Sequence, residues 1–227
     1  MAKSNTIISY RGNCGGCHYP DAEACKVEGL SVSYGPTGQR ALDDVSLRVG
    51  RGERIALVGD NGSGKSTLLK SLAGLITPQD GTIKVLGHVA GVCRHEVSYL
   101  PQRSTLDWDF PISVRNFVLT GSYVRLGWFI RPAQKERARA TTALEQMNLL
   151  PLAQRQIGSL SGGQQQRALV ARTLLHTAEL YLLDEPFNAV DASSRNLIWD
   201  ALDKLRENDS TVIMATHDIG HFLDRFD

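Results

Sequence analysis

Short apolar runs recur along this chain and alternate, from Lys65 onward, with longer segments whose apolar residues repeat at helical spacing. In the segment that starts at Lys65, for example, Leu68, Leu69 and Leu72 share one helix face. Strands that alternate with helices indicate an α/β fold with a largely parallel core sheet. The apolar runs predict strands at Val27–Tyr34, Val45–Val49, Ile55–Val58, Thr82–Leu86, Val97–Leu100, Leu180–Leu183 and Thr211–Ala215.

The pattern changes between Gln102 and Ser159, where no strand signal occurs. Helical spacing there predicts helices at Ser113–Leu126 and Gln134–Leu149, with prolines near their borders. We therefore expect a helical lobe, at about residues 103–160, inserted into the sheet domain.

The composition of the chain narrows the class of protein without naming a reaction. With 227 residues and 42% hydrophobic content the chain can bury a full core. Its formal net charge of +1 gives no broad attraction to nucleic acid, so we expect no nucleic-acid partner. No apolar run approaches the about eighteen residues of a membrane-spanning helix, and the first residues lack a signal-peptide core. We expect a cytosolic protein whose four cysteines stay free or bind metal.

The segment Gly59–Thr67 directly follows the apolar run Ile55–Val58 and fits the phosphate-binding pattern G-x-x-x-x-G-K-[ST]. In this pattern a buried strand ends in a glycine-rich loop, whose backbone N–H groups converge on phosphate oxygens at a helix N-terminus. Lys65 adds a positive charge near the β and γ phosphates, and Ser66 offers a hydroxyl to Mg²⁺. The alternative is a glycine-rich turn without a ligand. The candidate nucleotide-binding residues are Gly59, Asn61, Gly62, Ser63, Gly64, Lys65, Ser66 and Thr67.

Two carboxylates, Asp184 and Glu185, directly follow the apolar run Leu180–Leu183. Ligands of α/β sheets bind at the carboxyl ends of the strands, so both side chains are expected at that edge. There Asp184 can hold Mg²⁺, while Glu185 can polarise the water that attacks the γ-phosphate. Without the phosphate-binding loop, the same pair would be an ordinary turn at the end of a strand.

The segment Leu160–Gln164 opens the predicted helix Gln165–His176 with Ser161 as its cap. Free backbone N–H groups and the positive end of the helix make it a second candidate anion site. The alternative is a helix start without a ligand.

Together with Asp191 and Thr216–Asp218, these segments occur in the order and spacing of ATP-binding cassette (ABC) ATPases, and the chain resembles that family from about Lys26 to its end. The resemblance implies a P-loop NTPase core with a small antiparallel β lobe and an inserted helical lobe, and it implies ATP and Mg²⁺ as cofactors. It also implies a head-to-tail dimer of two copies. In such a dimer the segment of Ser161, Gly162, Gly163 and Gln164 in one subunit caps the γ-phosphate held by Lys65 of the other.

The same resemblance gives roles to four further residues. Tyr34 resembles the aromatic residue that stacks on adenine, and Gln102 the glutamine that contacts Mg²⁺ and the attacking water. His217 resembles the γ-phosphate switch, and Asp191 the aspartate that crosses the dimer interface. The alternatives are a strand-end aromatic residue, a loop amide, a histidine with local partners, and the N-cap of the helix predicted at Ala192–Leu205. The implied catalytic residues are Glu185, His217, Gln102 and Lys65, and the implied magnesium ligands are Ser66, Gln102 and Asp184.

The segment Val97–Val114, above all its run Asp107–Pro111, resembles ATPases of bacterial manganese, zinc and iron uptake transporters. The resemblance implies a metal importer whose ATPase sits on the cytoplasmic face of the cell membrane, bound to a permease and serving a separate substrate-binding protein. In that family the helical lobe receives a short helix of the permease, for which Trp108, Phe110, Phe117 and Val118 are suited. These side chains can instead pack the core of the lobe. Other cargo, or a soluble cassette ATPase without a transport role, remain the alternative functions.

Residues 1–25 differ from the rest of the chain because they are polar and carry cysteine and glycine, so we expect them to precede the cassette domain, residues 26–227. Cys14, Cys17, His18 and Cys25 would suffice for a tetrahedral zinc site. The alternative is an extension without such a role.

Overall fold

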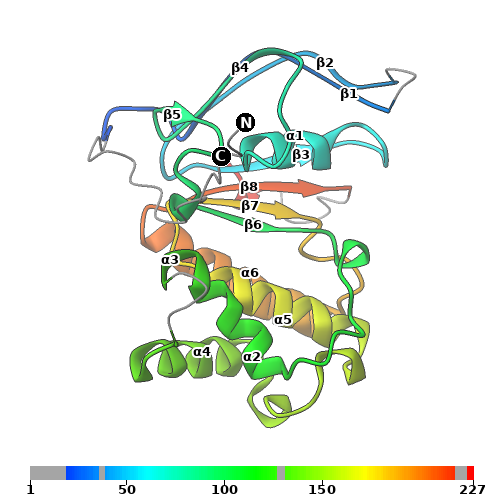
Figure 1. The fold of residues 1–227 in the computed structure, drawn as a ribbon, viewed down its shortest axis with the longest axis vertical. Helices are drawn as coiled ribbons and strands as arrows, with labels where there is room; N and C mark the ends of the chain where they lie inside the picture. The colour runs from blue at the N-terminus through cyan, green and yellow to red at the C-terminus, as the bar shows by residue number, and fades with distance from the viewer. Residues whose placement is uncertain (1–18, 36–38, 127–130, 218–223) are drawn as a thin grey trace, which may run out of the picture.

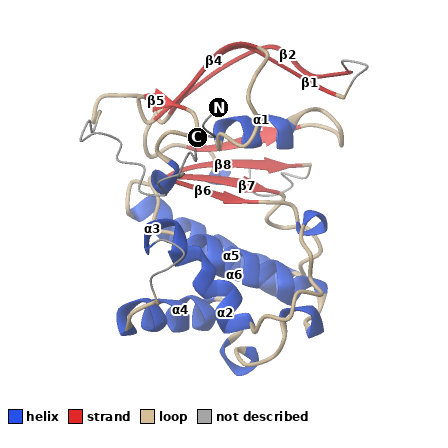
Figure 2. Ribbon diagram, in the orientation of Figure 1, coloured by secondary structure: helices blue, strands red, loops and turns tan. Residues whose placement is uncertain are grey.

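The structure, a computed structural model, describes residues 19–35, 39–126, 131–217 and 224–227. Two four-stranded sheets lie one above the other in Figure 1, and a layer of helices covers the far side of the parallel sheet. Figure 2 shows the helices gathered mainly on that side, with helix α1 between the two sheets. This arrangement confirms the expected α/β fold, with a parallel core sheet and an antiparallel β lobe.

The antiparallel sheet has the strand order β2-β1-β4-β5. Along its central strand β1, alternate residues such as Cys25 and Val27 are buried, as expected for a strand with one face on a core. Cys25 is paired with Val49 on one side and with Val85 on the other. The strands are β1 (Cys25–Tyr34), β2 (Gln39–Val49), β4 (Asp80–Val85) and β5 (His88–Val89).

The parallel sheet has the order β3-β8-β7-β6, and its two central strands are buried along their whole length. Val58 is paired with Thr216, and Asp184 with Ala215, so these strands end at one edge of the sheet. The segments that follow them therefore meet at this edge. The strands are β3 (Arg54–Val58), β6 (Val97–Leu100), β7 (Leu180–Asp184) and β8 (Thr211–Thr216).

Helices cover both faces of the parallel sheet. Helix α1 (Lys65–Leu72) contacts strands of both sheets, whereas α5 (Gly162–Leu175) and α6 (Ala192–Glu207) lie on the other face. Beyond α5 lie α2 (Val114–Leu119) and α4 (Gln134–Gln146), whereas the short α3 (Tyr123–Leu126) lies nearer the sheet. Among the described residues, none of the helices has the length and apolar character needed to cross a membrane.

The prediction of one helix over Ser113–Leu126 was wrong in detail, because a 3₁₀ turn at Thr120–Ser122 separates α2 from α3. The hydroxyls of Thr120 and Ser122 each donate to a carbonyl three residues earlier, at 2.6 and 2.7 Å. Such bonds favour the tighter turn over the α-helix. A Cβ atom on Gly121 would lie 2.1 Å from the carbonyl oxygen of Arg172, so the turn also packs directly on α5.

Other differences from the prediction include two element ends and one strand that was not predicted. Strand β2 starts at Gln39, six residues before the apolar run that predicted it, because its first half is largely exposed and polar. The two-residue strand β5 has no sequence pattern of its own. Helix α4 ends at Gln146 rather than at Leu149, since Asn148 adopts a left-handed φ of 51°.

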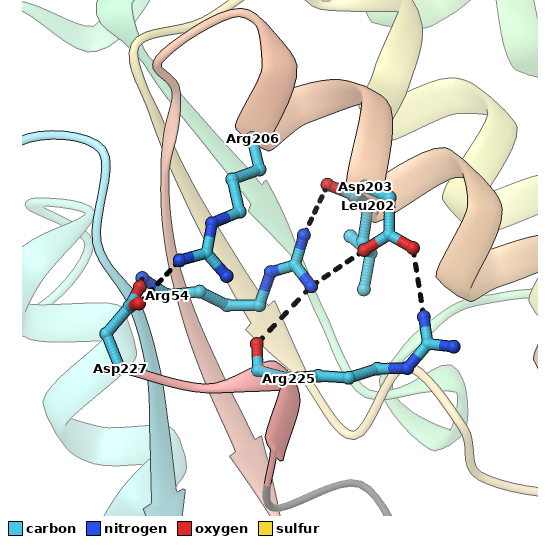
Figure 3. A network of polar contacts seen from close by, with 6 residues as sticks. All are labelled: Arg54, Leu202, Asp203, Arg206, Arg225 and Asp227. Carbon is cyan, nitrogen blue, oxygen red and sulfur yellow. Dashed lines mark hydrogen bonds and ion pairs between the residues drawn. The ribbon is translucent and has the colours of Figure 1, made fainter.

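A buried arginine joins the start of the parallel sheet to α6 and to the end of the chain (Figure 3). Arg54 is 2% exposed, and its guanidinium donates to the carbonyl oxygen of Leu202 at 2.8 Å and to Asp203 at 2.9 Å. Its backbone N–H donates to the carboxylate of Asp227 at 2.8 Å. Arg225 pairs with the other oxygen of Asp203 at 2.9 Å, so one network holds β3, α6 and residues 224–227.

We expect Arg54→Met to lower the free energy of unfolding by about 1–3 kcal/mol, because the buried carbonyl loses its donor while the apolar stem is kept. Urea unfolding measures this change. The matched control is Arg206→Met, which removes an exposed ion pair with Asp227 and is expected to cost less than about 1 kcal/mol. Equal effects of the two substitutions would contradict the role given to Arg54.

Candidate functional site

The phosphate-binding pattern forms a tight loop between β3 and α1, as its sequence predicted. Gly62 and Gly64 have φ values of 86° and 91°, in the left-handed region that favours glycine. A Cβ atom on Gly64 would lie 2.5 Å from the carbonyl oxygen of Ala41, whereas a Cβ atom on Gly62 would meet nothing within 4 Å. Gly64 also serves as the N-cap of α1, so the free N–H groups of that helix face the loop.

The Lys65 ammonium lies across this loop. Its Nζ atom donates to the carbonyl oxygens of Gly59 at 2.6 Å and Asp60 at 2.8 Å, and it lies 3.3 Å from the Ser63 hydroxyl. The positive charge is therefore held by neutral oxygens at the N-terminal end of α1. Phosphate oxygens would be stronger partners for the same ammonium, because they carry negative charge.

Polar side chains from helix α1, strands β6 and β7 and the loop after β6 converge around the Ser66 hydroxyl, next to Lys65. The Ser66 hydroxyl donates to Oδ1 of Asp184 at 3.0 Å, and the Tyr99 hydroxyl donates to Oδ2 at 3.4 Å. Nε2 of Gln102 lies 3.4 Å from the same Ser66 hydroxyl. The structure thus brings together the three residues expected to hold magnesium. Rotation of the Gln102 amide by half a turn would present its oxygen there.

The electrostatics of this cluster suit a cation. Burial raises the pKa of Asp184, the hydrogen bond from Ser66 lowers it, and the neighbouring charge of Glu185 raises it again. A divalent cation would stabilise the ionised carboxylate against this desolvation. Hard cations such as Mg²⁺ prefer carboxylate, hydroxyl and amide oxygens, which Asp184, Ser66 and Gln102 supply. The residues present therefore fit magnesium.

Glu185 lies at the start of the loop after β7, with a left-handed φ of 52°. Its N–H donates to the carbonyl oxygen of Ala215 at 3.0 Å, and its Oε2 accepts from Asn188 at 3.0 Å. Its Oε1 lies 4.0 Å from Nδ1 of His217, which follows β8. The structure therefore brings the two expected catalytic side chains together at the carboxyl edge of the sheet.

A cavity of about 310 Å³ joins these parts. The phosphate-binding loop, Tyr34, Gln102 and Glu185 line it. The Tyr34 hydroxyl lies 3.3 Å from the Thr67 hydroxyl, and the side chain stands at the mouth of the cavity as an exposed aromatic residue. Both features suit a planar base bound next to the loop.

The second candidate anion site does not line this cavity. Ser161 and Gln164 form a capping box at the start of α5, in which the Ser161 hydroxyl accepts from the Gln164 N–H at 3.3 Å. Asp191 caps α6 by accepting from the Ser194 N–H at 2.8 Å. Hydrogen bonds from Ser193 and Ser194 lower the pKa of Asp191 to about 2. Both local capping roles considered from the sequence are thus present, and a single chain leaves these residues away from the phosphate-binding loop.

Sequence reasoning missed three residues that support the site. Tyr99 bonds Asp184, and the buried Gln166 donates to the carbonyl oxygens of Glu185 at 3.3 Å and Pro186 at 3.0 Å. Arg103 donates to Gln165 Oε1 at 2.9 and 2.7 Å. The alternation of β6 directs Tyr99 toward α1, but no motif marks Gln166 or Arg103, because their partners come from other elements.

Most of the side chains considered for the permease contact pack inside the protein; they are Trp108, Phe110, Phe117 and Val118. Val118 is fully buried, and Trp108 and Phe117 pack against the helical core with their rings 5.9 Å apart. Phe110, at 58% exposure, is the member of this group that faces outward. The alternative of core packing therefore holds for three of the four residues.

The cysteines also depart in part from expectation. Cys14, Cys17 and His18 lie outside the described residues. Cys25 begins β1 and is fully buried, and burial raises the pKa of its thiol to about 12. Such a buried thiol contributes to packing and is a poor metal ligand, which argues against Cys25 as a ligand of the zinc site considered from the sequence. Cys25 is a free thiol, whereas Cys93 is disulfide-bonded.

Comparison with known proteins assigns the family. The family model described as "ABC transporter" matches residues 42–188, which is more than half of the chain. This protein therefore belongs to the ABC transporter family. Over 206 residues it is 42% identical to the "Zinc transport system ATP-binding protein TroB" of Treponema pallidum (strain Nichols), covering 91% of this chain and 77% of that protein.

A second relative and a solved structure agree with this assignment. The "Manganese transport system ATP-binding protein MntB" of Listeria innocua is 42% identical over 201 residues, or 88% of this chain and 83% of that protein. The fold matches the dimeric ATP-binding cassette MJ0796 in a post-hydrolysis state bound to ADP and Pi, with a TM-score of 0.76 and 28% identity. That match covers 86% of this chain and 88% of the other. The recognition of a nucleotide-binding ABC cassette from sequence is thus confirmed.

The loop geometry predicts unequal effects of two glycine substitutions. Gly62→Ala places a Cβ atom in open space and is expected to cost about 1–2 kcal/mol, for the left-handed conformation alone. Gly64→Ala adds a clash with the backbone of Ala41 and is expected to cost more. Urea unfolding of both variants without nucleotide measures the difference, and equal losses would contradict the close approach of β2 to the loop.

Proposed function

We propose that this protein is the ATP-hydrolysing subunit of a transporter that imports a transition-metal ion. The observation that carries the proposal is the meeting of the phosphate-binding loop, Asp184 and Glu185 at one edge of the parallel sheet. The relatives named for zinc and manganese transport support the choice of cargo. This subunit would bind an integral membrane permease from the cytoplasmic face of the membrane and drive its conformational change, and a separate substrate-binding protein would deliver the ion to the permease.

The lining of the cavity supports a specific mode of nucleotide binding. The adenine ring stacks on Tyr34, and the phosphates lie over the loop, where they replace the carbonyl oxygens that now hold the Lys65 ammonium. The N–H groups from Asn61 to Thr67 provide further donors to the phosphates. Ser66, Asp184 and Gln102 would hold Mg²⁺, which neutralises charge on the phosphate oxygens when it is bound.

Hydrolysis depends on the residues that follow β7 and β8. The Glu185 carboxylate accepts a hydrogen bond from the attacking water and takes up its proton as the water oxygen bonds to the γ-phosphorus. The bond from that phosphorus to the oxygen shared with the β-phosphate breaks at the same time, and ADP leaves with this oxygen. Asn188 and Gln166 fix the orientation of the Glu185 side chain and of its loop. His217, whose Nδ1 lies 4.0 Å from Glu185, would contact the γ-phosphate and pass the change to β8, and its position directly after β8 supports this role.

A head-to-tail dimer explains why one chain carries two candidate anion sites. Ser161, Gly162 and Gly163 stand outside the cavity of their own chain, with the N-terminal end of α5 beside them. In the dimer this helix end approaches the γ-phosphate bound by Lys65 of the second copy. Closure of the dimer around two ATP molecules is then the step that moves the permease.

A groove next to the nucleotide site suits a contact with the permease. This cavity of about 640 Å³ lies beside β6, and Tyr99 of that strand is part of its lining. The segment before β6, the region of α3 and the C-terminal part of α5 form its other walls. Leu75, Val92 and Val124 are exposed apolar side chains on its walls. A short amphipathic helix of the permease would bury them. The groove, rather than the partly buried Trp108, is the better candidate for this contact.

Glu185→Gln tests the proposed chemistry. We expect ATP hydrolysis to fall by about 100- to 10,000-fold, because the water loses its general base, while ATP binding persists. The ATP-bound variant is then expected to accumulate as a dimer, seen by gel filtration with light scattering. A Glu185→Gln variant that hydrolyses ATP like the parent would refute the role of Glu185.

Lys65→Ala tests the biological role. In the source cell under metal limitation we expect the variant to lower the total content of one metal among manganese, zinc and iron, with recovery when that metal is added. Elemental analysis of washed cells measures the contents. Suppose that the contents of all three metals are unchanged, although the variant is expressed and the cell has no redundant uptake system. This result would refute metal import but would not contradict the ATPase activity. Recovery of the protein in soluble fractions without membrane would favour a cassette ATPase that has no transport role.

A further inference from the structure

We propose that His88, Cys93 and Glu96 form a second metal site, separate from the nucleotide site and selective for zinc-class cations. One nitrogen of His88, the sulfur of Cys93 and one carboxylate oxygen of Glu96 all lie within 4.8 Å of one another. Cys93 is 5% exposed, and His88 and Glu96 are half-buried, so the three donors converge below the surface.

The backbone between β5 and β6 explains the convergence. A turn closes where the Val92 N–H donates to the carbonyl oxygen of Val89 at 3.2 Å, and Gly91 supplies its left-handed φ of 85°. A 3₁₀ helix, Arg94–Glu96, follows, and the Glu96 N–H donates to the carbonyl oxygen of Cys93 at 3.0 Å. With three residues per turn, Cys93 and Glu96 fall on one side of it, and the turn carries the chain back toward His88.

Neighbouring contacts hold the donors in place. The Tyr19 ring and the His88 imidazole pack edge to face, with ring centroids 5.1 Å apart. The carbonyl oxygen of Glu96 accepts from the Glu179 N–H at 3.0 Å, which ties the 3₁₀ helix to the start of β7. On its exposed side, the Glu96 carboxylate faces Nε2 of His95 at 3.6 Å. The site is therefore built on paired backbone rather than on a free loop.

The chemistry of the donors selects the class of cation. A thiolate, an imidazole and a carboxylate suit Zn²⁺ and similar ions, whereas Mg²⁺ and Mn²⁺ prefer oxygen ligands. Tetrahedral zinc with bonds of about 2.0–2.3 Å separates its donors by about 3.3–3.8 Å. The observed separations need to shrink by at most about 1.5 Å, which rotation of the three side chains provides. Three protein ligands leave a fourth position for water.

The disulfide at Cys93 makes the site dependent on reduction. A dithiol supplies two electrons and two protons, the S–S bond breaks into two thiols, and the dithiol is oxidised to its own disulfide. The Cys93 thiol then loses its proton as its sulfur binds the metal. A bound ion would fasten β5 to the segment that leads into β6, and β6 ends just before Gln102 of the nucleotide site.

Co²⁺ is a suitable probe, because thiolate ligation gives it a charge-transfer absorption. The full chain is reduced with a dithiol, freed of it by anaerobic gel filtration, and titrated with Co²⁺ alone. We expect one Co²⁺ per chain with this absorption, and no such absorption in the unreduced protein. Cys93→Ser is expected to abolish it. His88→Ala and Glu96→Gln are expected to weaken Co²⁺ binding by more than about 100-fold, which exceeds the loss typical of residues that only hydrogen-bond a metal ligand.

Two controls and two outcomes decide the proposal. Cys25→Ala and Glu28→Gln remove a thiol and a carboxylate outside the site, so both are expected to keep the absorption. Absorption that persists in Cys93→Ser would place the metal on other thiols of the chain and overturn the proposal. An unchanged affinity for Co²⁺ in Glu96→Gln would also overturn the proposal, even if another variant failed to fold, because this substitution keeps the size of the side chain. Because Co²⁺ binding is measured without ATP, these results are independent of the proposed ATPase and transport roles.

Discussion

The shared end of the parallel strands is the constraint on which the rest of the molecule depends. Backbone hydrogen bonds fix β3 against β8 and β8 against β7, so Val58, Thr216 and Asp184 reach the same edge. The two central strands, β7 and β8, are buried along their whole length, and a shift in register would break that burial. The loop that holds Lys65, the carboxylate of Glu185 and the imidazole of His217 all start from this edge, and their geometry is therefore set by the sheet.

Within the described residues of one chain, the charged groups at that edge have no partner of opposite charge that fully balances them, so they favour binding of nucleotide, magnesium and a second copy. The Lys65 ammonium rests on neutral oxygens, and Asp184 is an acid whose pKa is raised by burial. Each gains when an ion of opposite charge arrives, which is how nucleotide and magnesium would be bound together. The end of α5, with its capping box, offers the same kind of attraction to a second copy.

The antiparallel lobe adds a second set of constraints. Its edge strand β5 and the 3₁₀ helix before β6 bring an imidazole, a sulfur and a carboxylate together, far from any motif that marks the nucleotide site. Because the same segment leads into β6 and borders the groove proposed for the permease, metal, nucleotide and partner would all act on one short stretch of chain. Because Cys93 is disulfide-bonded, the proposed metal would bind only after this disulfide is reduced.

The sequence by itself determined the strands of the parallel sheet, the phosphate-binding loop and the family, because these rest on local patterns of burial and on contiguous motifs. Asp191 as the cap of α6 was likewise readable from neighbouring residues. Only the tertiary structure decided what depends on distant partners. Gln166 reaches the turn of Glu185, Thr120 and Ser122 break a predicted helix that packs on α5, and Cys25 is a core residue. His88, Cys93 and Glu96 meet because a turn and a 3₁₀ helix fold them together, and spacing alone does not reveal that contact.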